Sequence, residues 1–143
     1  MTILRMTNSD IQKIQSTLQT SFDDFWSSSI LKLEIANPRS TILAAKERDS
    51  IVGFGGSWES PDAIHITNIV VRKDKRKLGI GSNILEKLIE TGKDKDKEFT
   101  LEVNVNNTSA IRLYEKYHFE KVGTRKKYYN NTEDATIMTR RNK

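Results

Sequence analysis

The hydrophobic positions in the first third of the chain change from strand-like to helical spacing. Residues 2–6 predict a short strand. The apolar residues that follow recur at the spacing of a helix face: Ile11, Ile14 and Leu18. The residues just before them are of types that favour a helix N-cap: Asn8, Ser9 and Asp10. A second helical stretch covers about residues 25–36 and ends before Pro38, because a proline disfavours helical backbone in the residue that precedes it.

The middle of the chain has the pattern of strands. Residues 41–46 and 51–58 flank a polar turn at residues 48–50, which predicts a β-hairpin. Residues 63–71 are β-branched and mostly apolar, as is typical of a strand buried on both faces. A helix that ends at Gly92 follows. Its apolar positions are Ile80, Ile84, Leu85, Leu88 and Ile89.

The last third predicts strand, helix and two further strands. In residues 99–105 apolar and polar side chains alternate, so that Thr100, Glu102 and Asn104 share the polar face. Residues 108–117 form an amphipathic helix, and strands at about 119–128 and 135–140 flank a turn at residues 130–132. The order β-α-α-β-β-β-α-β-α-β-β predicts one α/β domain over residues 1–143, with helices layered on a mixed sheet.

Composition excludes several classes of protein. The 143 residues contain no cysteine, so no disulfide framework, cysteine-ligated zinc site or cysteine nucleophile is expected. The two histidines, His65 and His118, are too far apart in sequence to predict a metal site. No apolar run is long enough to span a membrane, and the N-terminal residues lack the pattern of a signal peptide, so we expect a cytoplasmic protein.

Positive charge is concentrated in the second half of the chain and most densely in one loop. The net charge is +5, with residues 1–60 at −1 and residues 61–143 at +6. Residues 72–77 contain five basic side chains and one acidic one, and Gly79 and Gly81 follow at the start of the predicted helix. Free backbone N–H groups and the helix dipole favour an anion there, which predicts a pyrophosphate site. The same residues also suit a solvated basic loop whose glycines ease a turn, and they match neither the dinucleotide-binding nor the P-loop fingerprint.

Four ordered blocks give this loop a context, and with them the sequence resembles the GCN5-related N-acetyltransferases (GNAT). Residues 76–81 fit the family's Arg/Gln-x-x-Gly-x-Gly/Ala signature between a strand and a helix. The other blocks are residues 68–71, residues 101–107 with 110–114, and Tyr128-Tyr129 with residues 133–138; together they span residues 68–138. Within the family, the resemblance is to the RimI-type N-terminal protein acetyltransferases. Two positions depart from the family pattern: His118 stands where a glycine is usual, and Asn106 replaces a serine.

The resemblance implies a fold and an activity. The implied fold is a mostly antiparallel, mixed seven-stranded sheet flanked by four helices, with splayed middle strands. The implied reaction transfers acetyl from acetyl-CoA directly to the N-terminal amine of a protein, such as an Ala or Ser N-terminus of a ribosomal protein. Neither a metal nor a membrane is expected to take part.

The resemblance also implies roles for individual residues. The cofactor-binding residues would be Ile69, Val70, Val71, Arg76, Lys77, Leu78, Gly79, Ile80, Gly81, Ser82 and Asn107. Glu102 would be the general base, and Tyr114 would be the general acid that protonates the leaving thiolate. The substrate-binding residues would be Trp26, Tyr128 and Tyr129. Spacing alone favours reading Glu102 as an ordinary charged residue on a sheet face. Tyr114 and Trp26 also suit core positions, and Tyr128 and Tyr129 also suit a pair of strand aromatics, one facing in and one facing out.

Two other functions remain open at this stage. An acetyltransferase for a small-molecule amine would have the same cofactor loop, although the Tyr128-Tyr129 block favours a peptide. The basic second half also suits a nucleic-acid-binding module. We consider nucleic acid the weaker expectation, because the densest basic run lies on the glycine turn, where the phosphates of CoA would explain it equally well.

Overall fold

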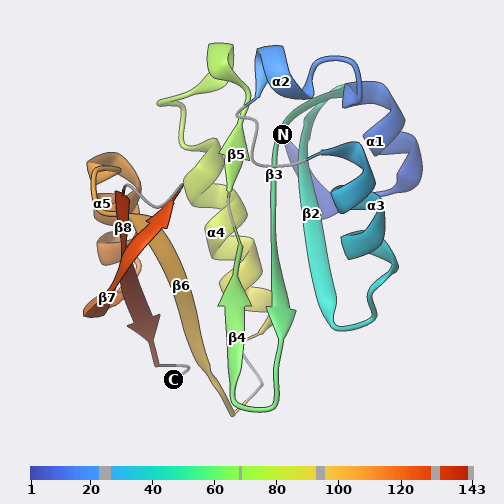
Figure 1. Ribbon diagram of the computed structural model, residues 1–143. Helices are drawn as coiled ribbons and strands as arrows, with labels where there is room; N and C mark the ends of the chain where they lie inside the picture. The colour runs from blue at the N-terminus through green and yellow to red at the C-terminus, as the bar shows by residue number, and fades with distance from the viewer. Residues whose placement is uncertain (23–26, 68, 93–95, 130–132, 142–143) are drawn as a thin grey trace.

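The computed structural model describes residues 1–22, 27–67, 69–92, 96–129 and 133–141, with the backbone alone at residues 19, 20 and 127–129. One sheet runs through the molecule (Figure 1). Its strands in spatial order are β1 (Thr2–Arg5), β2 (Ser40–Glu47), β3 (Ser50–Glu59), β4 (Ala63–Ile66), β6 (Glu98–Asn104), β8 (Glu133–Arg140) and β7 (Glu120–Tyr129), and the short β5 (Val70–Val71) also pairs with β3. The β4–β6 pair is parallel, whereas the other described pairs are antiparallel.

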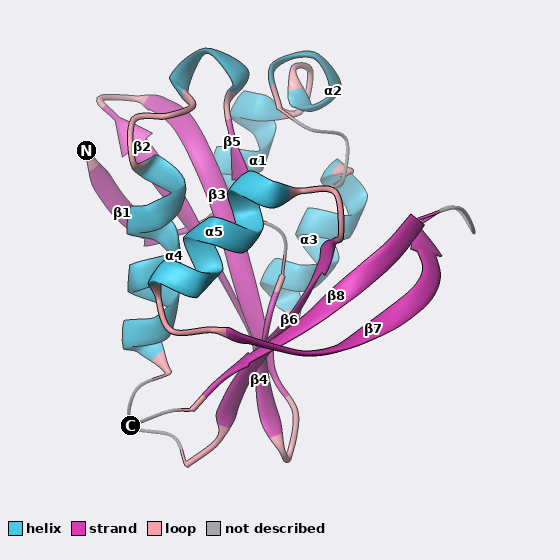
Figure 2. Cartoon of the chain, turned by 90° about the vertical axis from the view of Figure 1, so that its left-hand side faces the viewer, coloured by secondary structure: helices cyan, strands magenta, loops and turns pink. Residues whose placement is uncertain are grey.

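Helices cover both faces of the sheet. They are α1 (Asn8–Ile14), α2 (Leu18–Ser21), α3 (Ser28–Ala36), α4 (Ile80–Thr91) and α5 (Thr108–Lys116), with a 3₁₀ turn η1 (Lys73–Lys75) before α4. Side chains alternate across β2, so Ile42 and Ala44 pack with α1–α3 while Leu43 and Ala45 pack with α4 and α5. Figure 2 shows β7 and β8 swinging away from β3 as a two-stranded arm. The predicted fold, a mostly antiparallel sheet flanked by helices, is confirmed.

The N-terminal helices differ in detail from the prediction. Thr7 caps α1 instead of the three residues after it: its hydroxyl accepts from the Asp10 N–H, and Asp10 accepts from the Thr7 N–H. The helix ends at Ile14, and Leu18 lies in the separate single turn α2. The second predicted helix begins later than expected, because Ser27 caps α3 at Ser28.

The strand expected over residues 63–71 is two strands, and the prediction that it is buried on both faces is wrong. In β4, Ile64 and Ile66 are buried while Ala63 and His65 are half-buried. The alternation arises because the α4–α5 core covers one face. The break between β4 and β5 comes where β4 leaves β6, after the last paired residues His65 and Thr100.

The remaining elements follow the sequence closely. The hairpin of β2 and β3, the helix that Gly92 ends, and the alternation of β6 all lie where the periodicity predicted them. His118, which replaces the usual glycine, has φ 72°. It ends α5 in a Schellman motif, in which the Phe119 N–H donates to the Tyr114 carbonyl and the His118 N–H donates to the Glu115 carbonyl, both at 3.0 Å.

Candidate functional site

A gap in the sheet opens where β5 and β6 diverge. In the described residues, the β4–β6 ladder ends at His65 and Thr100, and β5 pairs with β3 alone. The Arg72 N–H donates to the Val52 carbonyl at 2.8 Å, and the alternation of an antiparallel ladder then directs the backbone groups of Val71, and of Ile69 two residues earlier, away from β3. A strand-like polar edge therefore faces the gap, and an extended ligand can pair with it.

The glycine loop lies at one end of this gap and presents an anion site. Lys77 and Gly79 have φ values of 64° and 81°, and Gly79 is the N-cap of α4 without any side-chain cap. The first N–H groups of α4, those of Ile80, Gly81 and Ser82, have no partner within the helix. A Cβ on Gly81 would lie 3.6 Å from Val71 Cγ2, at ordinary contact distance, so packing does not require glycine there. Glycine instead leaves the helix end open, and these residues fit a pyrophosphate.

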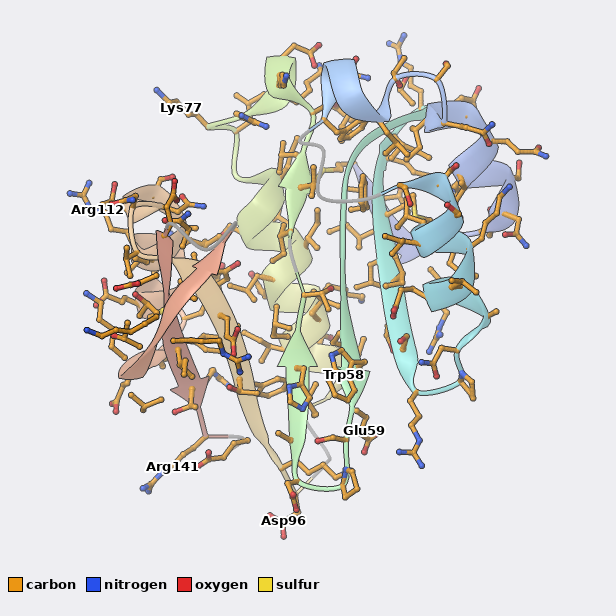
Figure 3. All side chains as sticks on the ribbon, viewed as in Figure 1. Trp58, Glu59, Lys77, Asp96, Arg112 and Arg141 are labelled. Carbon is orange, nitrogen blue, oxygen red and sulfur yellow. The ribbon has the colours of Figure 1, made fainter. Side chains whose placement is uncertain are left out.

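The basic run before the glycines is partly neutralised. Arg72 pairs with Asp74 at 2.6 Å, and Lys75 pairs with Glu47 at 3.3 Å. Arg76 donates from Nε to the Val71 carbonyl at 3.2 Å. Lys77 points outward from the tip of the loop (Figure 3), and the Leu78 side chain next to it is 66% exposed. The loop therefore presents mainly backbone N–H groups, with fewer available cations than its sequence suggests.

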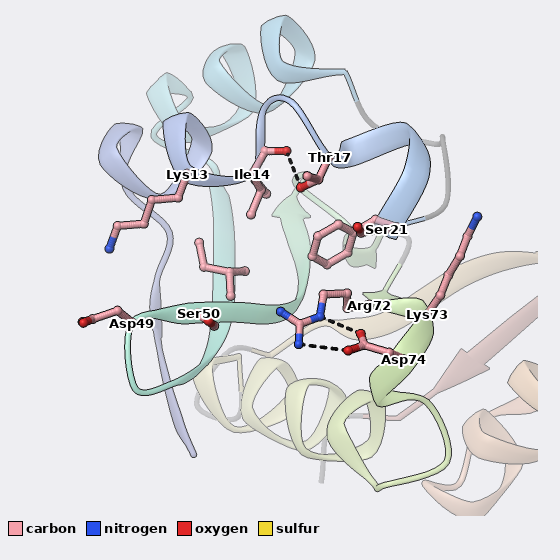
Figure 4. A pocket seen from close by; sticks show the side chains of 11 residues that line it. Lys13, Ile14, Thr17, Ser21, Asp49, Ser50, Arg72, Lys73 and Asp74 are labelled. Atoms are coloured by element: carbon pink, nitrogen blue, oxygen red, sulfur yellow. Dashed lines mark hydrogen bonds and ion pairs between the residues drawn. The ribbon is translucent and has the colours of Figure 1, made fainter.

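A surface pocket lies near the start of this loop, on the side of α1 and α2 (Figure 4). Its charged lining residues are Lys13, Asp49, Arg72, Lys73 and Asp74. Acidic and basic side chains are mixed there, and the Arg72–Asp74 pair lies within it. This arrangement gives no selectivity for an anion, so the open end of α4 is the better phosphate site.

Two side chains of the predicted cofactor set have structural partners. Ser82 Oγ lies 2.7 Å from the Tyr117 hydroxyl, which also donates to Glu86 at 3.3 Å. Asn107 is the N-cap of α5: its Oδ1 accepts from the Ala110 N–H at 3.3 Å. The first contact joins α4 to the end of α5, and the second caps the start of α5.

Glu102 lies on the polar face of β6 as the alternation predicted. Its side chain is 23% exposed, and Oε1 lies 2.6 Å from Nη2 of Arg125 on β7. Asn104, two residues along the same face, donates to Glu133. The carboxylate is thus accessible from the face of the sheet opposite α4 and α5.

His65 is a residue of this face that sequence reasoning did not include. Its ring stacks on Trp58 with centroids 3.9 Å apart, and Nε2 lies 3.1 Å from Ser60 Oγ. Burial lowers the pKa of His65, and the charge of Glu102 offsets only part of that shift. The parallel register that pairs His65 with Thr100 brings it to Glu102's face. The linear sequence does not show this strand pairing, and His65 could therefore not be assigned to Glu102's face from sequence.

Tyr114 lies on the other side of the sheet. It is 7% exposed within the α4–α5 core, and its ring meets Phe119 edge-on with centroids 5.8 Å apart. Glu102 and Tyr114 therefore belong to opposite faces of the sheet. Trp26 lies outside the described residues. Tyr128 and Tyr129 belong to β7, but their side chains also lie outside what is described.

Neither a metal cluster nor a membrane helix is found in the described part of the chain. No group of three His, Asp or Glu side chains there is placed to hold a metal ion. No helix of the structure is both long and apolar enough to cross a membrane.

Comparison with known proteins points to one family. The model of the acetyltransferase (GNAT) family matches residues 11–119. A Bacillus subtilis protein, named provisionally as a ribosomal protein bS18-alanine N-acetyltransferase, is 33% identical over 132 residues, which cover 90% of this chain and 87% of that protein.

Solved structures agree with this result. The crystal structure of the ribosomal-protein-S18-alanine N-acetyltransferase from Escherichia coli has a TM-score of 0.86 at 26% identity and covers 99% of this chain and 93% of its own. The Arabidopsis thaliana NAA60 structure in complex with acetyl-CoA has a TM-score of 0.82 at 18% identity, covers 98% of this chain and 97% of its own, and shows the shared fold.

Proposed function

The chain belongs to the acetyltransferase (GNAT) family, and we propose that it transfers the acetyl group of acetyl-CoA to the N-terminal amine of a protein. The observation that carries this proposal is the gap between β5 and β6, which has an open helix N-terminus at one end and the Glu102 carboxylate on one face. An extended thioester in that gap would meet an amine that arrives on Glu102's face.

The chain's backbone would supply most of the cofactor contacts. Backbone groups of Ile69 and Val71, with Val70 between them, would pair with the pantetheine arm, and the N–H groups of Ile80 to Ser82 would hold the pyrophosphate. Arg76, Lys77, Leu78 and Gly79 would form the rest of the loop. Asn107 would contact the arm through Nδ2, because its Oδ1 caps α5.

Glu102 would take the proton of the attacking amine. Acetyl-CoA supplies an activated thioester carbonyl, and only an amine with a free electron pair attacks it. A peptide α-amine has a pKa of about 7.7–8.0, so a single carboxylate acting directly or through water suffices to deprotonate it near neutral pH. A backbone N–H at the edge of β5 would stabilise the developing oxyanion.

Tyr114 would give a proton to the thiolate of the leaving CoA. Tyr114 lies on the opposite side of the sheet from Glu102. This supports the assignment of Glu102 as base and Tyr114 as acid, because the amine and the thiol would then lie at opposite faces of the sheet. Trp26, Tyr128 and Tyr129 would border the substrate N-terminus. A ribosomal protein N-terminus beginning with Ala or Ser is the proposed substrate, which would place the enzyme in the cytoplasm.

The test is an acetylation assay on matched peptides. A peptide with a free Ala or Ser N-terminus should gain one acetyl group with acetyl-CoA, while the same peptide with a blocked N-terminus and internal lysines should not. Calorimetry should separately show acetyl-CoA binding. Acetyl-lysine on the blocked peptide at a comparable rate, measured by mass spectrometry, would reject the N-terminal assignment. Turnover of small amines with no peptide turnover would favour a small-molecule acetyltransferase.

A further inference from the structure

The Glu102 side chain is already in contact with a cation on the face of the sheet from which the substrate would approach. The guanidinium of Arg125 contacts it at 2.6 Å, from the outer strand of the arm formed by β7 and β8 (Figure 2). The Arg125 side chain is 57% exposed, whereas that of Glu102 is 23% exposed. A cation already lies where the ammonium form of a substrate amine would make its best contact, and it can withdraw into solvent.

The surroundings of Glu102 make this cation decisive for the local charge. On β6 its neighbours on the same face, Thr100 and Asn104, are uncharged, and its paired residue on β8 is Ile137. Glu133 accepts a hydrogen bond from Asn104 and keeps its own negative charge further along this face. Burial lowers the pKa of His65 on β4 below its ordinary value, which favours the neutral imidazole. The Glu102 carboxylate and the guanidinium in contact with it thus nearly cancel each other at the point where the amine would bind.

A site in which Arg125 neutralises Glu102 would bind the protonated and the neutral form of an amine differently. A protonated amine must displace Arg125 from Glu102 or lie beside its positive charge, whereas a neutral amine meets neither penalty. At pH 7.5, about a third of a peptide α-amine is neutral, but only about one lysine side chain in a thousand is. A site that penalises ammonium groups therefore favours α-amines.

We propose that Arg125 is a specificity-determining residue, which pairs with Glu102 in the free enzyme and so disfavours protonated amines, lysine side chains above all. This inference rests on the proposed function and adds a basis for its choice of amine. Arg125 acts through Glu102 and takes no proton itself.

The variant Arg125→Gln tests the proposal through the pH dependence of KM. At pH 6.5 most of a peptide α-amine is protonated. There we expect the KM of the variant for the peptide to fall about threefold to tenfold, because the Glu102 carboxylate, no longer paired with Arg125, then attracts the ammonium. At pH 9 the KM should equal that of the wild type, and kcat should stay within about twofold at both pH values. The blocked, lysine-containing peptide should gain measurable acetylation. Arg125→Lys, which keeps the charge, should behave like the wild type.

Lys126→Gln is the matched control, since it removes the same charge from the next residue of β7. It should leave KM unchanged; a fall equal to that of Arg125→Gln would overturn the proposal in favour of a general charge effect. A loss of kcat in Arg125→Gln at unchanged KM would also overturn it, because Arg125 would then orient Glu102 for the chemistry. An unchanged acetyl-CoA affinity checks the fold of each variant.

A binding experiment separates this inference from the proposed function. The affinities of a free-amine peptide and its N-acetylated copy are compared at pH 6.5, and the preference for the free amine should grow in Arg125→Gln. If the wild type acetylates no peptide, the proposed function fails. If it acetylates peptides but Arg125→Gln changes neither KM nor this preference, the inference alone fails.

Discussion

The hydroxyl of Tyr117 lies 2.7 Å from that of Ser82 and ties the end of α5 to the first turn of α4. Ser82 belongs to the open helix end that is proposed to bind pyrophosphate, and Tyr117 is the C-cap residue of α5. The two helices are far apart in sequence and flank the gap from one side of the sheet. This hydrogen bond therefore connects the phosphate end of the cofactor site to the helix that carries Tyr114.

Tyr117→Phe removes that connection with little change of shape. We expect the free energy of unfolding to fall by about 1 kcal/mol, as for an ordinary intramolecular hydrogen bond, and the dissociation constant of acetyl-CoA to rise a fewfold. Denaturant unfolding and calorimetry measure the two effects. Ser82→Ala should have a smaller effect on stability, because Tyr117 keeps its bond to Glu86. Unchanged values for both variants would show that the contact does not hold the helices in solution.

Gly81→Asp places a negative charge at the open end of α4. The affinity for acetyl-CoA should drop at least about tenfold, because the carboxylate competes for the N–H groups proposed to hold the pyrophosphate. Gly81→Asn is the matched control, with the same shape and no charge, and should lose less. Since a Cβ at this position has ordinary contacts at 3.6–4.0 Å, both variants are expected to fold. Equal affinities in wild type and Gly81→Asp would contradict the phosphate assignment.

His118→Gly should stabilise the protein. His118 has φ 72°, a left-handed conformation that costs a residue with a Cβ roughly 1–2 kcal/mol, and part of this gain is offset by the greater freedom of glycine in the unfolded chain. We expect a net increase of about 0.5–1 kcal/mol in the free energy of unfolding. His118→Ala keeps the strain and should show no increase. A destabilised glycine variant would mean that the imidazole makes a compensating contact.

Local periodicity predicted the local parts of this fold well. The alternation over β6 correctly placed Glu102 opposite the buried Leu101 and Val103, and the helical spacing located α4 and its end at Gly92. The glycine after α5 expected from the family pattern is explained by the left-handed turn that His118 adopts. Each of these features depends on neighbours within a few residues.

Long-range pairing decided the features that the sequence did not predict. Residues 63–71 have one uniform composition, yet the departure of β6 after Thr100 splits them into two strands. Glu47 neutralises Lys75 from the β2–β3 hairpin, which no local pattern of charges indicates. Arg125 reaches Glu102 across β8, so the ion pair that we propose to control amine selection depends on the order of strands in the sheet.

The ion pair between Asp10 and Lys46 should make stability depend on pH. Burial alone raises the pKa of Asp10, but hydrogen bonds from Lys46 and Thr7 outweigh it, so the pKa lies below its ordinary value. The stabilisation is thus present above the unfolded-state pKa of about 4 and is lost as pH falls below that value. Lys46→Met should cost about 2–3 kcal/mol at pH 7, somewhat less than the loss of a partner from a fully buried pair, because the Lys46 side chain is 22% exposed.

Unfolding curves of wild type and Lys46→Met at several pH values test this expectation. The difference between them should shrink as pH falls below about 4, where the protonated Asp10 no longer pairs with Lys46. Lys13→Met, which removes an exposed cation from the last turn of α1, should cost only a few tenths of a kcal/mol. A Lys46→Met deficit that persists unchanged at low pH would assign the loss to side-chain packing instead of charge.

The pH–rate profiles of Glu102→Gln and Tyr114→Phe separate the proposed base from the proposed acid. Loss of a positioned acid or base typically costs about 10²–10⁴-fold in rate, so both effects are measurable. Glu102→Gln should lower kcat/KM most at low pH, where the amine is protonated and Arg125, no longer paired with Glu102, repels it, and raising the pH toward 9 should restore part of the activity. Tyr114→Phe should lower kcat with acetyl-CoA affinity nearly retained, and its defect should not shrink as pH rises, because a higher pH supplies no proton to the thiolate. Tyr114 also packs on Phe119 in the core, and phenylalanine keeps that contact, so a lost rate in a variant of unchanged stability belongs to the hydroxyl. Full kcat in Tyr114→Phe across the pH range would make Tyr114 a packing residue and leave protonation of the thiolate to water. Full activity of Glu102→Gln at pH 6.5 would mean that the amine reaches the site already neutral.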